Sequence, residues 1–349
     1  MSIINKDIWQ MLKETDRSVV IYGTGNGADK IIDEFERLMI RISAVTASDD
    51  HIRGQFFRGF KVRSLSDAAA EFADPIIIIA FGSQRKEVIE HILSLAKKFT
   101  VLCADVPVYG GNIFNRDFYE SNYQQIKHAR EILADVHSKK VFDNIINFKL
   151  SGELSYLTDS FSPKDEAFKL LDLSGNESYL DLGAYRGDTI DEFTGLTCGK
   201  YQSITAIEPD RKTFLKLREH VGSLKNIRLF NMGIWNEDTD LVFESSRGRG
   251  SSINDSGSAV LAVTKIDTLY KRQKVSYIKA DVEGAEEQMI LGGKNVIARD
   301  NPKLNIALYH RSEDIFKLPL MIYSINPEYK FYIRQHPHIP AWDMNLYAV

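Results

Sequence analysis

Two stretches of the chain share one pattern: a short apolar run, a turn rich in glycine, and then a helical alternation of apolar and charged positions. The first stretch covers residues 18–39 and the second covers residues 178–193. A buried parallel strand that leads through a glycine turn into a helix is how doubly wound α/β sheets begin. The pattern therefore predicts an α/β protein with two doubly wound, Rossmann-like domains.

The segments that follow each turn set the expected domain boundaries. Apolar runs and amphipathic helices alternate as far as residue 104, whereas residues 116–160 are polar and helical without a strand-like run. We predict an N-terminal domain over residues 1–115, a helical connector over residues 116–160 and a second domain over residues 161–349. In the N-terminal domain the expected strands are 18–22, 40–47, 76–80 and 101–104, and the expected helices are 1–17, 28–39, 66–72 and 85–97.

The second domain ends in two strand-like runs joined by a turn that contains proline, which is the pattern of a β-hairpin. Between its third and fourth strands, residues 245–258 are rich in Ser and Gly, a composition typical of a loop, and we expect this loop at the tip of a small hairpin. The expected strands are 179–182, 203–207, 227–232, 277–280, 304–309, 329–335 and 344–349, and the expected helices are 188–193, 211–221, 285–292 and 313–325.

Composition and charge narrow the class of protein. The 349 residues include 44 Lys and Arg against 48 Asp and Glu, whereas chains that bind nucleic acid through phosphates usually carry a basic excess. No apolar run approaches the ~20 residues that cross a bilayer. The two cysteines, Cys103 and Cys198, are too few for a disulfide framework or a cysteine zinc site. We expect a cytoplasmic protein whose partner is a small molecule, and leave a homo-oligomer open.

Glycines and acids at the ends of the first two strands of the second domain form a candidate binding site. Asp181, Gly183 and Gly187 occupy the first turn, where glycine lets the backbone approach a ligand and helix amides can donate to it. Glu208 ends the second strand, where a carboxylate can accept both hydroxyls of a ribose. A tight turn beside an ordinary surface glutamate is the alternative, but the two motifs together, in register with the strands, favour a nucleotide-like ligand.

The next two strands end in groups that can move a proton. Asp281 and Glu283 follow the fourth strand and His310 follows the fifth, so all three are expected at one edge of the sheet. With an ordinary pKa of ~6.5, His310 suits a general base, and the two acids would orient it or the acceptor. We expect no metal, although two carboxylates and an imidazole also suit a divalent cation, and that alternative stays open. Glu286 is expected to cap the following helix.

The segments "YLDLGAYRGDT", "IEPD", "VTKIDTL", "YIKADVEGAEEQMILGG" and "LYHRSEDI", with the closing hairpin, resemble the FkbM-type S-adenosylmethionine-dependent methyltransferases over about residues 161–349. "KADVEGAE" is the specific part. The resemblance implies a class I methyltransferase fold that ends in a β-hairpin, S-adenosylmethionine as cofactor, and methylation of hydroxyls on sugars, glycan precursors or related metabolites. It further implies that Asp181, Gly183 and Gly187 bind the methionine part of the cofactor and Glu208 its ribose, and that Asn231, Met232 and Gly233 lie near its adenine.

The glycine turn of the N-terminal domain is a second candidate ligand site. Gly23, Gly25 and Gly27, with Asp49 or Asp50 downstream, could hold a dinucleotide, but the third glycine stands two positions after Gly25 and not the usual three. The segment is similar to N-terminal nucleotide-sugar-binding domains of bacterial sugar-modifying enzymes. A Rossmann-like domain used only for packing is the alternative. Two other functions stay open for the chain, a nucleotide-sugar oxidoreductase and a non-catalytic nucleotide or sugar sensor.

Overall fold

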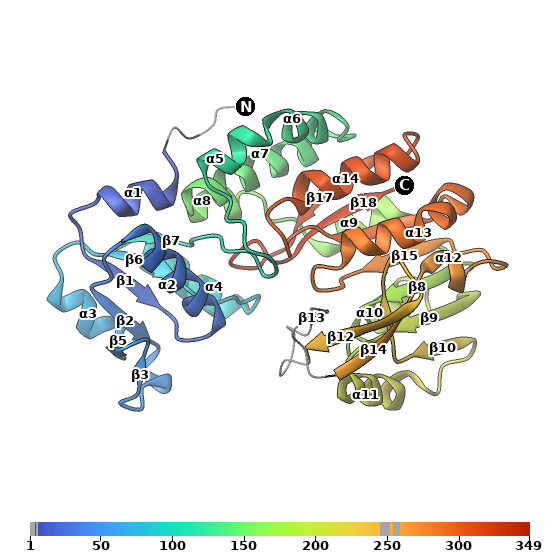
Figure 1. Ribbon diagram of the computed structural model, residues 1–349, viewed down its shortest axis with the longest axis horizontal. Helices are drawn as coiled ribbons and strands as arrows, with labels where there is room; N and C mark the ends of the chain where they lie inside the picture. Colours follow the sequence, from blue (N-terminus) through green and yellow to red (C-terminus); the bar gives the residue numbers. More distant parts are fainter. Residues whose placement is uncertain (1–3, 5, 245–251, 254–258) are drawn as a thin grey trace.

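The computed structural model describes residues 4, 6–244, 252–253 and 259–349. Figure 1 shows an N-terminal sheet and a C-terminal sheet, with a group of helices between them in the upper part of the view. Most of the predicted loop 245–258 lies outside the described residues. Within the described part of the chain, no helix is both long and apolar enough to cross a membrane.

The N-terminal sheet has five parallel strands in the order β5-β2-β1-β6-β7, which confirms a doubly wound arrangement. Runs of β-branched residues make its centre, and every residue of β1 and β6 is buried. A short antiparallel hairpin, β3 (Phe56–Phe57) and β4 (Phe60–Lys61), lies beside it. The strands are β1 (Val19–Tyr22), β2 (Ala44–Ala47), β5 (Arg63–Ser64), β6 (Ile76–Ile79) and β7 (Thr100–Leu102), and the helices are α1 (Ile8–Glu14), α2 (Asn26–Leu38), η1 (Asp49–His51), α3 (Leu65–Glu71) and α4 (Lys86–Ala96).

Four helices follow: α5 (Arg116–Ser121), α6 (Tyr123–Glu131), α7 (Val136–Ser151) and α8 (Leu154–Thr158). Helix α7 covers the edge strand β17 (Phe331–Gln335), where the Ser138 hydroxyl accepts the Ile333 amide and Arg334 pairs with Asp135 at 2.8 Å. At its other end, Lys149 forms a buried ion pair of 2.8 Å with Asp105. One hydrophobic core accordingly runs from β6 through α7 to the C-terminal sheet.

The C-terminal sheet has seven strands in the order β10-β9-β8-β15-β16-β18-β17, in which β18 alone runs in the opposite direction to the other six. This order, with its closing hairpin, is the class I methyltransferase layout that the sequence predicted. The strands are β8 (Ser178–Leu182), β9 (Ser203–Ile207), β10 (Ile227–Phe230), β15 (Tyr277–Ala280), β16 (Lys303–Ala307), β17 and β18 (Met344–Ala348), and the helices are α9 (Lys164–Leu171), α10 (Asp188–Leu196), α11 (Arg211–Val221), α12 (Ile266–Leu269), α13 (Glu286–Asp300) and α14 (Asp314–Ile325).

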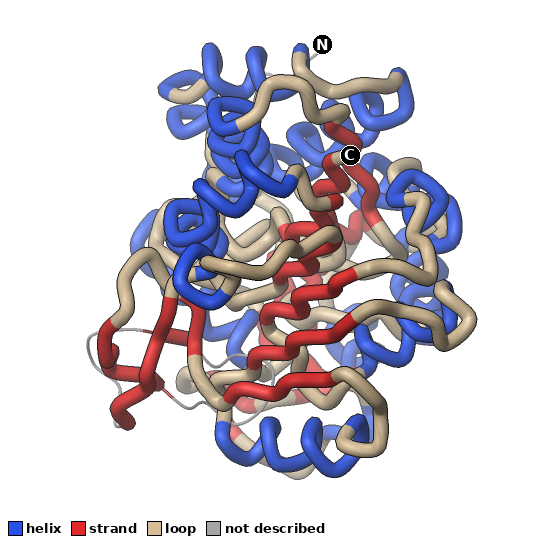
Figure 2. The backbone as a smooth tube through the Cα atoms, turned by 90° about the vertical axis from the view of Figure 1, so that its right-hand side faces the viewer, coloured by secondary structure: helices blue, strands red, loops and turns tan. Residues whose placement is uncertain are grey.

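A separate four-stranded sheet is inserted between β10 and β15, apart from the main sheet (Figure 2). Its long pair, β12 (Thr239–Glu244) and β14 (Ala259–Thr264), is antiparallel, as the predicted hairpin requires. The short strands β11 (Gly233–Ile234) and β13 (Ser252–Ile253) complete it. The run 227–232, expected as one strand, is therefore a strand only as far as Phe230, and the next strand, β11, begins at Gly233 in the other sheet.

Helix α13 runs well beyond its predicted end at residue 292, because Gly292 and Gly293 do not stop it. A Cβ atom on Gly292 would lie 2.1 Å from the carbonyl oxygen of Trp235. Gly292 therefore allows the helix to pack closely against the inserted segment. In the sequence, a glycine kept for close packing looks the same as a glycine that ends a helix.

Candidate active site

A cavity of about 310 Å³ opens at the carboxyl ends of the C-terminal strands. Ligands of open α/β sheets bind at this edge. Its walls come from the turn after β8, the end of β9, the segment after β15, helix α9, the hairpin turn 336–345 and one residue of the N-terminal domain, Gln84.

The turn after β8 is shaped by glycine. Gly183 has a φ of +79°, and a Cβ atom there would lie 1.9 Å from the carbonyl oxygen of Asp281, so no other residue fits. Gly187 also has a positive φ and is the N-cap residue of α10, which begins at Asp188. Asp181 is fully buried beneath the turn, accepts the Thr189 hydroxyl at 2.5 Å, and has its pKa raised by burial. Gly183 lines the cavity, whereas Asp181 and Gly187 shape the turn from behind.

Glu208 lies where the sequence predicted it, at the end of β9 and in the cavity wall. Its Oε2 accepts the Tyr185 amide at 3.0 Å and its Oε1 accepts the Asp210 amide at 2.8 Å. Burial raises the pKa of Glu208 to about 7, although both amides favour the ionised form. Each oxygen keeps a lone pair that a ligand hydroxyl can use.

Of the three residues predicted to lie near the adenine, the structure places only one in the cavity wall. Gly233 lines the cavity, together with the neighbouring Ile234. Asn231 uses its side-chain amide to donate to the carbonyls of Glu208 and Pro209, both at 2.9 Å, and Met232 packs against the hydrophobic core. Asn231 and Met232 are therefore placed to support the wall, and Gly233 and Ile234 to face a ligand.

Asp281, Glu283 and His310 come together at the cavity edge. His310 Nε2 lies 3.4 Å from Asp281 Oδ1 and 3.5 Å from Glu283 Oε2. The two acids line the cavity, while the imidazole is fully buried behind them. Glu283 has a φ of +52°, a strained conformation for a residue with a side chain, and such strain often marks a functional site.

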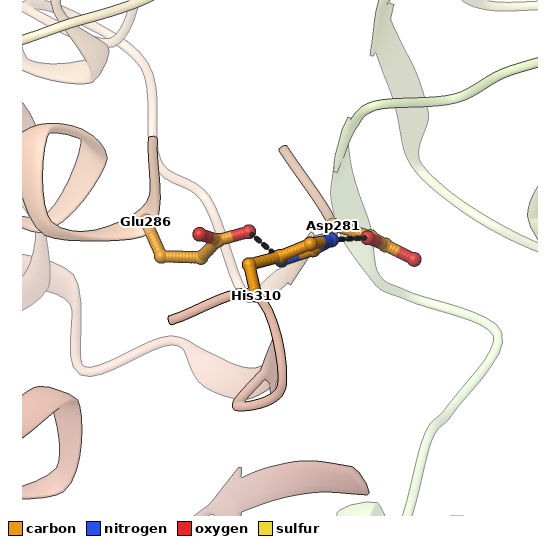
Figure 3. Close-up of side chains that lie close together, drawn as sticks. All are labelled: Asp281, Glu286 and His310. Atoms are coloured by element: carbon orange, nitrogen blue, oxygen red, sulfur yellow. Dashed lines mark ion pairs between the residues drawn. The ribbon is translucent and has the colours of Figure 1, made fainter. Parts of the chain in front are cut away.

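Glu286 proved more than a helix cap. It accepts the Val282 amide at 2.9 Å with Oε1, and the same oxygen lies 2.9 Å from His310 Nδ1 (Figure 3). Burial lowers the pKa of His310, but Glu286, Glu283 and Asp281 outweigh it and hold that pKa well above 6.5. The prediction of an unperturbed imidazole was therefore wrong, because a buried carboxylate faces its other nitrogen.

Two further residues belong to the site and were missed in the sequence. The Tyr309 hydroxyl donates to both carboxylate oxygens of Asp281, at 3.0 and 3.1 Å. Lys279 points to the same face of β15 as Asp281, and its Nζ lies 3.8 Å from Asp281 Oδ2. Strand alternation could have identified Lys279, which stands two residues before Asp281, whereas Tyr309 lies beyond the end of β16 and has no such signal.

The N-terminal domain contacts this site through the segment after β6. Ser83 bridges Ile339 of the hairpin turn, and a Cβ atom on Gly82 would lie 2.6 Å from the Trp342 ring. Beside the cluster, the Tyr109 amide donates to the His310 carbonyl at 2.8 Å. The cavity wall is thus held from both domains.

The N-terminal glycine turn has a different setting. Cβ atoms on Gly23 and Gly27 would lie 3.1 and 2.8 Å from the Ala80 carbonyl oxygen, so these glycines allow the turn to pack on the end of β6. Asp49 begins the exposed turn η1. Gly23, Gly25, Gly27 and Asp49 do not line the cavity at the C-terminal sheet.

Comparisons with known proteins agree with this architecture. Residues 181–342 match the family model of the methyltransferase FkbM domain. The methyltransferase FkbM of Methylobacillus flagellatus KT has a similar fold over 95% of this chain and 90% of its own, with 22% identity and a TM-score of 0.71. Fibrillarin of Aeropyrum pernix, solved with S-adenosyl-L-methionine bound, aligns with 53% of this chain and 74% of its own at 16% identity and a TM-score of 0.34. No curated protein matches the sequence.

The strand order and the cavity at the carboxyl ends of the strands define the class I methyltransferase fold. Residues 181–342 are therefore similar to the methyltransferase domain of the FkbM family, and S-adenosylmethionine is the cofactor. The residues fit that donor: Glu208 offers free lone pairs to ribose hydroxyls, Gly183 leaves room for close approach, and a lining rich in carboxylates suits a sulfonium cation.

Proposed function

We propose that this chain transfers the methyl group of S-adenosylmethionine to a hydroxyl of a sugar, a glycan precursor or a related small metabolite. One observation carries the proposal: the cavity that contains Gly183 and Glu208 also contains the carboxylates of Asp281 and Glu283, with His310 directly behind them. A hydroxyl must lose its proton as the new bond forms, and a cluster of basic groups beside the methyl can take up that proton or offset its charge.

The reaction itself needs mainly alignment. The acceptor oxygen attacks the methyl carbon in line with the sulfur, the carbon–sulfur bond breaks, and its electron pair stays on sulfur. Holding donor and acceptor in one cavity can contribute about 7–11 kcal/mol to such a step. We assign the methionine part to the turn after β8, the ribose to Glu208 and the adenine to the wall at Gly233.

The charge of the cavity supports an uncharged acceptor. Its lining contains the carboxyl groups of Asp188, Glu192, Glu208, Asp210, Asp281, Glu283 and Asp343, and the amines of Lys164 and Lys279. This excess of carboxylates attracts the sulfonium of the donor. It repels an acceptor that carries phosphate or carboxylate next to the reacting hydroxyl, so a neutral polyol or sugar ring fits best.

The sequence predicts His310 as the general base, but its burial limits how an acceptor hydroxyl can reach it. Because the ring is fully buried behind Asp281 and Glu283, an acceptor in the cavity meets the carboxylates first. We therefore propose that the three side chains act as one unit on the hydroxyl proton, with Glu286 orienting the imidazole.

We propose a supporting role for the N-terminal domain, in which the turn at Gly23, Gly25 and Gly27 with Asp49 anchors a nucleotide-linked sugar. Gln84 supports the proposal, since it follows the strand on which this turn packs and itself lines the cavity. An acceptor anchored there would enter the cavity past Gln84.

The experiment is to incubate the full chain with S-adenosylmethionine and panels of free sugars, nucleotide sugars and glycan precursors, and to measure S-adenosylhomocysteine formed. We expect acceptor-dependent formation and a product that carries one methyl group on oxygen. Binding of S-adenosylhomocysteine without turnover on any acceptor would indicate a sensor. Acceptor-dependent change in nicotinamide absorbance would instead indicate the oxidoreductase.

A further inference from the structure

We propose that Asp281, Glu283 and His310 Nε2 together bind one divalent cation at the edge of the cavity. Binding of the cation rests only on the geometry of these side chains. Its use in methyl transfer rests on the proposed function, and the test below separates the two.

The spacing of the three atoms fits coordination better than hydrogen bonding. Nε2 lies 3.4 Å from Asp281 Oδ1 and 3.5 Å from Glu283 Oε2. Hydrogen bonds from nitrogen to oxygen usually span about 2.7–3.2 Å. Ligand bonds of about 2.1 Å place neighbouring ligand atoms about 3.0 Å apart in an octahedron and about 3.4 Å apart in a tetrahedron. The two observed nitrogen–oxygen distances each match an edge of such a polyhedron.

Neither imidazole nitrogen makes a regular hydrogen bond to the residues the structure describes; Nδ1 is ion-paired with Glu286, and Nε2 has only the two carboxylates, at the longer distances given above. The side chain is fully buried, so water does not surround it from behind. A buried polar atom without a partner is costly, and such an atom in a native protein calls for an explanation. A cation between Nε2 and the two carboxylates supplies one.

The surrounding groups resemble the outer shell of a metal site. Metal-binding histidines usually turn their second nitrogen to a carboxylate, and metal-binding carboxylates are themselves hydrogen-bonded. Here His310 Nδ1 lies 2.9 Å from Glu286 Oε1, on the opposite end of the ring from Asp281 (Figure 3). The Tyr309 hydroxyl donates to Asp281. Glu286 is therefore the orienting group of this site, and Glu283 completes the ligands.

The charges around the cluster leave room for a cation. Lys279 Nζ, at 3.8 Å from Asp281 Oδ2, approaches from the sheet. Arg311 is directed away, since its Nε donates to the Gly284 carbonyl and its guanidinium lies 4.3 Å from the centre of the Tyr109 ring. Asp314 accepts the Arg311 amide and adds a further carboxyl group near Glu286. Acids thus outnumber bases about the buried imidazole.

Two carboxylates and one imidazole suit Mn²⁺, Mg²⁺, Fe²⁺ or Zn²⁺, and the positions that face the cavity stay free for the acceptor. A hydroxyl bound there loses its proton to water in the cavity more easily, because the cation lowers the hydroxyl pKa. Its oxygen then forms the bond to the methyl carbon as the carbon–sulfur bond breaks. In this arrangement His310 is a ligand and accepts no proton.

The test is a titration of the full chain, saturated with S-adenosylhomocysteine, with Mn²⁺, in which electron paramagnetic resonance measures the free ion. We expect one Mn²⁺ per chain, at least tenfold weaker binding for Asp281→Asn and His310→Ala, and about 10–100-fold weaker binding for the outer-shell variant Glu286→Gln. The control Glu131→Gln, at an exposed glutamate of α6, should bind Mn²⁺ as the wild type does, and thermal unfolding checks that each variant folds.

The wild type binding no Mn²⁺ at millimolar concentration, or all variants binding it equally, would overturn the proposed site. Activity measured with EDTA and after Mn²⁺ is restored tests the role of the cation. If Mn²⁺ binds through these residues but no acceptor is methylated, the cation site stands and the proposed function fails. If methylation proceeds unchanged in EDTA, the function stands and the cation has no part in it.

Discussion

The two glycine turns of this chain look alike in sequence and have different surroundings in the structure. The turn after β8 opens on the cavity at the C-terminal sheet, where Glu208 at the end of the next strand binds the turn through the Tyr185 amide. The turn after β1 packs against the Ala80 carbonyl, and its downstream acid Asp49 is exposed. A glycine in such a turn therefore indicates close approach of a backbone, and only the acid and the cavity beside it indicate a ligand.

The largest expected effect is on the rate at the C-terminal site. His310→Ala removes the centre of the cluster that assists loss of the hydroxyl proton, so turnover should fall by about 10²–10⁴-fold, the range for loss of acid–base assistance. Binding of S-adenosylhomocysteine should stay near the wild-type value, because the donor residues are untouched. His220→Ala, a half-exposed histidine on α11, is the matched control. Full turnover in His310→Ala would remove this residue from the reaction.

The second prediction concerns how the N-terminal domain is attached to helix α7 of the connector. Lys149→Met leaves Asp105 as a charge without its partner in a place where both side chains are only 4% exposed. Loss of one partner of a buried pair costs about 3–5 kcal/mol, which thermal or urea unfolding should show. Lys127→Met, which removes half of the exposed pair with Glu131, should change stability by less than about 1 kcal/mol. Equal effects would mean that the buried pair does not join the domains.

Alanine at one glycine of each turn compares the turns directly. Gly183→Ala combines a positive φ with a Cβ atom 1.9 Å from the Asp281 carbonyl, so it should cost more than about 2 kcal/mol of stability. Gly25→Ala meets nothing within 4 Å and should cost less than about 1 kcal/mol. The measurement is denaturant unfolding of both variants. An unchanged free energy of unfolding in Gly183→Ala would contradict the close approach of the turn after β8 to the Asp281 carbonyl.

A smaller effect is expected from pH. Burial raises the pKa of Glu208 to about 7, and only the ionised carboxylate can accept both ribose hydroxyls. Below that pH the group must first lose a proton, so affinity for S-adenosylhomocysteine should fall by up to about tenfold per pH unit. Calorimetry between pH 6 and 8 should show affinity that rises with pH in the wild type and is flat in Glu208→Gln. The same slope in both proteins would assign the effect to another group.

Local sequence patterns predicted most of the fold because each strand and turn carries its own signal. Runs of β-branched residues predicted the buried strands β1 and β6. The two acids after β15 predicted the edge of the C-terminal sheet at which Asp281 and His310 meet. The sequence did not predict the raised pKa of His310, since it depends on burial of Glu286 opposite the ring. It also missed Gln84 in the cavity wall, because only the contact between the two domains brings it there.

The most direct test of the account is to titrate the full chain with S-adenosylhomocysteine by calorimetry in two matched variants, one for each turn. Glu208→Ala should weaken binding by about 1.5–3 kcal/mol, the range for hydrogen bonds to a charged group. Asp49→Ala should bind as the wild type does, since Asp49 lies outside the cavity. Unchanged affinity in folded Glu208→Ala, or loss of affinity in Asp49→Ala, would contradict the assignment of the donor to the C-terminal turn.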